Sequence, residues 1–361
     1  MSDHFGQDPD FLGKIPLFAE LQRLMSWDGG PINWDLAEQV AAAAASQHEG
    51  AGANAVPREE IDQAFDLAGR LIADATSLEV AEAQPETLGA VSWSRTARTR
   101  LGPLMEPVAA RSAGTDLTEA FPVPEGMPIE ELSKALQAAG PMLFAFQAGS
   151  AVGAASGLVT GWSDLGIIPE VPSVELLPAS LGRHIREASI DERAGLQAAA
   201  LQSLAARTVA HMATTLRTRW LAAFLETVAA LEIDLAGMGD RLPDLSDPEA
   251  MMNMLQGGFE FEPGPAAQTA RERVEAIGGL FLAATDLVAR AGGARAGIPG
   301  EVFDAVTVAR RSPEVTALRS VMALPPLETT PATGFVQAVV AEGGYELLQV
   351  ALDDPLRGPE V

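Results

Sequence analysis

The chain has 361 residues, of which 47% are hydrophobic and 20% charged, so it can bury a core and is too apolar for an intrinsically disordered protein. Its 49 acidic and 24 basic residues give a net charge of −25, which disfavours nucleic acid and anionic lipid as partners. It contains no cysteine, which excludes disulfides, thiolate zinc sites and iron–sulfur clusters.

Apolar residues recur at spacings of three and four along most of the chain, and alternating Val/Ile/Thr runs are few. This pattern predicts a mainly α fold with little or no β-sheet. In chain order, the predicted helices span 34–46, 57–75, 94–113, 128–139, 141–161, 191–235, 246–255, 265–291, 299–310, 313–322 and 333–352. We expect a single helical unit over residues 1–361, or two lobes that meet near residue 170, with flexible ends at 1–14 and 353–361.

The stretch between Lys134 and Asp164 carries no charge and is long enough for a membrane span. Its glycines lie four residues apart, from Gly149 to Gly161, so that a helix would present them on one face and allow close contact with another helix. Small and polar residues dilute its hydrophobicity, and neither a basic cluster nor an aromatic belt flanks it. The N-terminus also lacks a secretory signal. We therefore predict a buried core helix in a cytoplasmic protein, with a membrane span as the minority alternative.

Four histidines are the candidate metal ligands or bases. His184 has no partner at helical spacing and is interpreted as a surface residue. His211 lies in a predicted helix, where it shares a face with Leu204, Thr208 and Thr215. A lone histidine on such a face is usually structural. The residues alone therefore assign it no chemistry.

Several blocks along nearly the whole chain together form one pattern. They are Gly30–Ala37, Trp93 with Met105–Ala109, Met142–Gly149, Leu177–Ala179 and Phe335–Val340. In these blocks the chain resembles a bacterial family, the zincin-like type 2 metallopeptidases, whose members are often labelled hydrolases or proteins associated with deazaflavin-coenzyme biosynthesis. The resemblance implies a helical body in which the glycine-rich helix is part of a soluble protein.

Active zincins carry H-E-x-x-H on a helix, in which two histidines bind zinc and the glutamate deprotonates the attacking water. The resemblance aligns this motif with residues 207–211. Arg207 then replaces the first ligand, Thr208 replaces the base, and His211 alone is retained. The third ligand position falls at Gly278 when Asp286 is the landmark. Arginine cannot ligate zinc, so no zinc cofactor is expected.

The broken motif predicts a non-catalytic binding or scaffold protein, with a protein or peptide as the partner. The candidate groove comprises Arg207, Thr208, His211 and Asp286. Arg207 could bind a ligand carboxylate or pair with an internal one, and both interpretations stay open. The alternative is an active hydrolase, either metal-free or using zinc held by His211 together with Glu272, Glu275 or Asp286.

Overall fold

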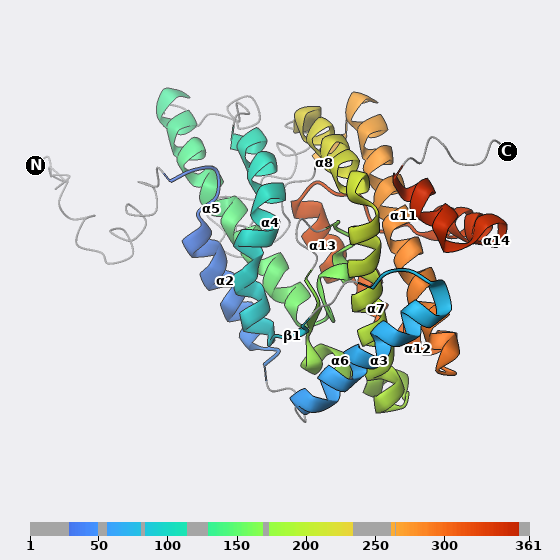
Figure 1. Cartoon of the computed structure of the whole chain (residues 1–361). Helices are drawn as coiled ribbons and strands as arrows, with labels where there is room; N and C mark the ends of the chain where they lie inside the picture. The colour runs from blue at the N-terminus through green and yellow to red at the C-terminus, as the bar shows by residue number, and fades with distance from the viewer. Residues whose placement is uncertain are drawn as a thin grey trace, which may run out of the picture.

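The computed structural model describes residues 29–49, 56–80, 84–113, 129–168, 173–233, 261–263 and 265–353. The predicted helix 246–255 and the predicted flexible end 1–14 lie outside them, as does the predicted flexible end 353–361 apart from Asp353, which is the last residue of helix α14 (Thr330–Asp353). The mainly α fold is confirmed, because helices dominate and the strands form two short two-stranded sheets. Figure 1 shows one group of helices on the left and a second group on the right, with α13 (Pro313–Val321) between them.

The left group consists of α2 (Trp34–Ser46), α4 (Ala90–Ala113) and α5 (Ile129–Ser156), which pack against one another. Helix α2 has the predicted bounds, and its N-terminus is capped by the Asn33 side chain, which accepts from the Leu36 N–H. The predicted break between 139 and 141 is wrong, because α5 continues through Pro141.

Two glycines of the predicted stripe, Gly149 and Gly153, form a contact between α5 and α2, whereas Gly157 and Gly161 lie beyond the end of α5 at Ser156. A Cβ added at Gly149 would lie 2.5 Å from the Ala37 carbonyl oxygen, and one at Gly153 would lie 2.5 Å from the Ala44 Cβ. The glycines therefore allow the two helices to approach more closely than side chains would permit. Within the described ranges, no helix is both long and apolar enough to cross a membrane.

The right group is built around α7 (Glu192–Met212), which packs against α3 (Arg58–Thr76) and α11 (Pro265–Arg295). The predicted single helix 191–235 is wrong at its centre. The backbone of Ala213 leaves the helical region at φ −114° and ψ 65°, and α8 (Thr214–Ala229) begins after it. No glycine or proline marks this break in the sequence. Residues 231–233 form β3, which pairs with β4 (Phe261–Pro263) in an antiparallel sheet.

Short elements between the two groups position the polar residues of the interior. The 3-10 helix η3 (Trp162–Leu165) follows α5, and β2 (Glu175–Leu176) pairs in parallel with β1 (Glu86–Thr87). Helix α6 (Pro178–Ala188), which was not predicted, comes directly after β2. The remaining elements are α12 (Gly300–Val306), η4 (Val308–Arg311) and α14 (Thr330–Asp353). The buried apolar residues form one cluster that extends from Ile32 to Leu352.

Candidate functional site

The three predicted motif residues of α7 have different surroundings. Arg207 is half-buried and lines a pocket. Thr208 is buried, and its hydroxyl donates to the Leu204 carbonyl oxygen at 2.9 Å, one turn earlier in the helix. His211 is exposed near the C-terminal end of α7. All three residues therefore lie on α7, but of the three only Arg207 lines the pocket described below.

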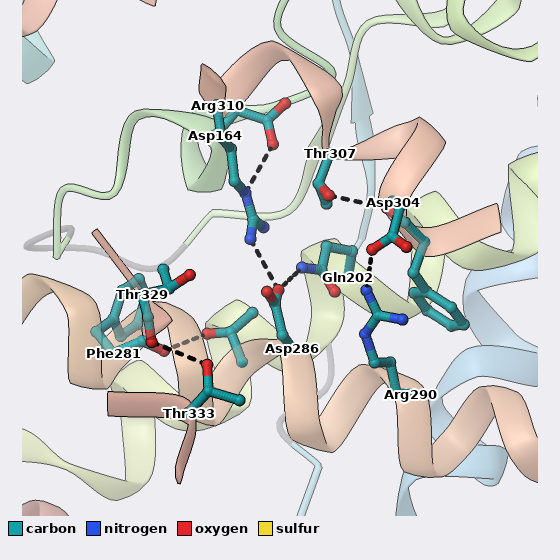
Figure 2. A network of polar contacts seen from close by, with 12 residues as sticks. Asp164, Gln202, Phe281, Asp286, Arg290, Asp304, Thr307, Arg310, Thr329 and Thr333 are labelled. Atoms are coloured by element: carbon teal, nitrogen blue, oxygen red, sulfur yellow. Dashed lines mark hydrogen bonds and ion pairs between the residues drawn. The ribbon is translucent and has the colours of Figure 1, made fainter. Parts of the chain in front are cut away.

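Asp286, the fourth predicted groove residue, belongs to a separate network in the interior (Figure 2). Its Oδ1 accepts from the Gln202 amide and from Arg310 Nη1, the latter at 2.8 Å. Arg310 Nε also donates to Asp164 Oδ1 at 3.3 Å, and Asp164 Oδ2 accepts from the backbone and hydroxyl of Thr160. The network connects α11, α7, η4 and η3.

Charge balance explains how the Arg310 guanidinium is tolerated inside the protein. Burial lowers its pKa, but Asp286 and Asp164 act against burial, and the net pKa lies above its ordinary value. Arg319, on α13, is also buried, and the charge of Glu275 only partly opposes the effect of burial on its pKa. It donates to the carbonyl oxygens of Leu165 and Pro325, and burial lowers its pKa to about 9. Both arginines therefore form hydrogen bonds with residues of η3.

A small pocket is lined by residues of η3, β2, α7 and α11. It encloses about 20 Å³, which is room for a water molecule or a small polar group. Its lining residues are Trp162, Ser163, Ile167, Ser173, Glu175, Ser203, Ala206, Arg207 and Phe281. We call it the Glu175 pocket.

Glu175 is the buried carboxylate of this pocket, and its side chain is 1% exposed. Oε1 is bound by the Arg100 guanidinium and accepts from the Ser173 hydroxyl at 2.9 Å. Oε2 is buried and has no hydrogen-bond partner among the described residues. Burial raises the pKa of Glu175, although Arg100 and Ser173 oppose that shift.

Aromatic rings fix the wall of the pocket beside Glu175. The Trp162 ring stacks on Trp93 with centroids 4.6 Å apart, and the Arg100 guanidinium lies 5.2 Å from the Trp162 ring centroid. The Trp162 indole N–H favours the charged form of Glu175, yet it completes no hydrogen bond within the described part of the chain. The pocket thus contains a buried acceptor and a buried donor that are both incompletely satisfied.

The side chains predicted as additional zinc ligands are engaged elsewhere. Glu272 is exposed and accepts from Gln268 at 3.0 Å, Glu275 interacts electrostatically with Arg319, and Asp286 is bound by Arg310. Across the described residues, no group of three or more His, Asp or Glu side chains could hold a metal ion.

Sequence reasoning missed Glu175, Arg100 and Arg310. Glu175 lies in a proline-containing stretch outside every predicted helix, and its partner Arg100 is 75 residues away, so no local pattern joins them. The interpretation of His184 as a surface residue is wrong: it is 2% exposed and lies on the buried face of α6. The strong amphipathic pattern of residues 178–188 was the signal that could have shown this.

Three comparisons place the chain among known proteins. The family described as zincin-like metallopeptidases matches residues 32–356. No functionally curated protein matches the chain. A crystal structure from Chloroflexus aurantiacus, described as "a putative hydrolase with a novel fold", has 16% sequence identity and a TM-score of 0.60, and the match covers 91% of this chain and 93% of that one. At this identity the likeness shows a shared fold.

Proposed function

The chain belongs to the zincin-like metallopeptidase family, and we propose that it keeps the family's fold without zinc chemistry and works as a non-catalytic binding or scaffold protein. The observation that carries this proposal is the side-chain set of α7 at the position where H-E-x-x-H is expected. There the helix has Arg207, Thr208 and His211.

This side-chain set does not fit a zinc ion. Arg207 has no lone pair to donate, and its positive charge opposes a dication. His211 is exposed and is one ligand where a catalytic zinc needs three. The third expected position, Gly278, has no side chain, and a Cβ there would face the Gly166 carbonyl oxygen at 3.5 Å and Trp220 Nε1 at 3.6 Å.

The general base is missing as well. Thr208 stands where the motif has glutamate, and a hydroxyl cannot take a proton from water near neutral pH as a carboxylate can. Its hydroxyl is also committed to the Leu204 carbonyl oxygen at 2.9 Å. No step that depends on a zinc-bound water is therefore available to these residues.

The Glu175 pocket is the proposed binding site. Its lining includes the motif residue Arg207 together with the buried carboxylate of Glu175. We expect the partner to be a protein or peptide that inserts a small polar group there.

A metal-free hydrolase is the second candidate function, and one observation favours it. Glu175 is a buried carboxylate whose pKa is raised by burial, which is a property of general bases. In that case Glu175 would accept a proton from water, and Arg207 would stabilise the negative charge that develops on a substrate carbonyl oxygen.

Peptide hydrolysis by the full-length chain tests the proposal. A mixture of fluorogenic peptides is incubated with untreated, chelated and zinc-supplemented protein, alongside the Glu175→Gln variant. We expect no turnover above the buffer rate in any sample. Turnover that disappears on chelation and returns with zinc would establish a zinc peptidase. Turnover that resists chelation and disappears in Glu175→Gln would establish the metal-free hydrolase.

A further inference from the structure

The Glu175 pocket presents a hydrogen-bond acceptor and hydrogen-bond donors to the same small space. The acceptor is Glu175 Oε2, which is buried and has no partner among the residues described. The first donor is the indole N–H of Trp162, buried and likewise without a complete hydrogen bond there. The second donor is Arg207, which lines the pocket. An arginine has five N–H donors, so an interaction elsewhere does not exhaust it.

The acceptor is held rigidly. Arg100 and Ser173 both bind Oε1, so the carboxylate cannot turn Oε2 away from its position without losing those bonds. Trp162 is fixed in the same way, because it lies against both Trp93 and Arg100. A site whose polar atoms are already oriented loses little conformational entropy when it binds a ligand.

Size and charge together select the group that fits. The volume of about 20 Å³ admits a small polar group and excludes a larger one. An ammonium group would satisfy Glu175 but would face the charge of Arg207. A carboxylate would satisfy Arg207 but would face Glu175. A neutral group with an N–H donor beside a carbonyl acceptor can form a hydrogen bond with either residue without repulsion between like charges.

We propose that the Glu175 pocket binds a primary carboxamide, whose N–H donates to Glu175 Oε2 and whose carbonyl oxygen accepts from Trp162 Nε1–H or Arg207. This inference rests on the proposed function, because it names the chemical group that the binding site recognises. The amide can come from a glutamine or asparagine side chain of a peptide or from a small free amide.

Nuclear magnetic resonance of the tryptophan indole N–H groups provides a direct test. The chain has five tryptophans, and the Trp162→Phe variant identifies the Trp162 signal by its loss. The full-length protein is titrated with acetamide, and separately with acetate, methylammonium and N,N-dimethylacetamide. We expect a saturable shift of the Trp162 signal with acetamide alone. The absence of a saturable shift with acetamide, or an equal shift with any control compound, would overturn the proposal.

Variants locate the binding to this pocket. We expect Arg207→Leu to weaken acetamide binding about tenfold or more, as the loss of a hydrogen bond to a charged group does. Glu175→Gln should weaken it as well while retaining the shape of the side chain. The matched control is Arg98→Leu on α4, an exposed arginine whose ion pair with Glu38 lies outside the pocket lining. Unchanged affinity in both pocket variants, with native circular dichroism spectra, would contradict the proposed contacts.

Two tripeptides distinguish the sources of the amide. Gly-Gln-Gly binding tighter than acetamide would indicate a peptide side chain, whereas tighter binding of acetamide would indicate a free amide, and both results support the carboxamide. Binding of Gly-Glu-Gly with the same affinity as Gly-Gln-Gly would overturn the carboxamide proposal. The outcome is separable from the proposed function, because zinc-dependent turnover would refute that function whatever this pocket binds.

Discussion

Arg310 Nη1 lies 2.8 Å from Asp286 Oδ1 and joins the short helix η4 to the long helix α11 inside the protein. The same guanidinium reaches Asp164, whose side chain is fully buried, while the Arg310 side chain is 8% exposed. The positive charge therefore stabilises a carboxylate that has no access to water.

Replacing Arg310 with methionine should be strongly destabilising, because Asp164 would remain buried without its counter-charge. We expect a loss of about 3–5 kcal/mol in the free energy of unfolding, measured by chemical denaturation. The control is Arg290→Met, which removes the exposed ion pair with Asp304 and should cost about 0–1 kcal/mol. Equal losses in the two variants would contradict the role of Arg310.

The glycine stripe predicts a second stability difference. Gly149→Ala places a Cβ 2.5 Å from the Ala37 carbonyl oxygen, so α5 and α2 must separate, at a cost of about 1–3 kcal/mol. Gly334→Ala, on the exposed face of α14, meets nothing within 4 Å and should be neutral or slightly stabilising, because alanine favours a helix. Thermal denaturation of both variants measures the difference. A neutral Gly149→Ala variant would show that the helix contact is looser than described.

The lowered pKa of the buried His184 side chain should make the stability of the protein depend on pH. Burial lowers its pKa from the usual 6.5, while Asp164 and Glu187 oppose that shift. The unfolded chain therefore binds a proton that the folded chain does not, and stability should fall as pH decreases from 6.5 through the folded pKa. We expect His184→Gln to show a shallower fall in the free energy of unfolding over that range. An identical slope in the variant would refute this assignment.

The pKa of Glu175 is shifted in the direction opposite to that of His184. Burial raises its pKa from 4.5, so its contribution to stability is complete below pH 4.5 and is lost as pH rises through the folded pKa. The free energy of unfolding of the wild type, relative to that of Glu175→Gln, should therefore decrease as pH rises above 4.5. Denaturation at a series of pH values measures it, and a difference that is constant with pH would contradict the raised pKa.

Local patterns predicted most of the helices but not the interior polar residues. Helix α2 has a capping asparagine before it and a regular apolar face, and its bounds were predicted to the residue. The break at Ala213 and the continuation of α5 through Pro141 depend on packing with other helices, which no local pattern encodes. Glu175 with Arg100, and Arg310 with Asp286, are pairs brought together by the tertiary fold, so their partners could not be found from spacing.

Zinc content tests the central claim most directly. The full-length chain, purified without chelator or nickel affinity, is dialysed against trace zinc and analysed for metal together with the His211→Ala variant. The account predicts no zinc above background in either protein, because Arg207, Thr208 and His211 provide one ligand in place of three. About one zinc per chain in the wild type, lost in His211→Ala, would contradict it.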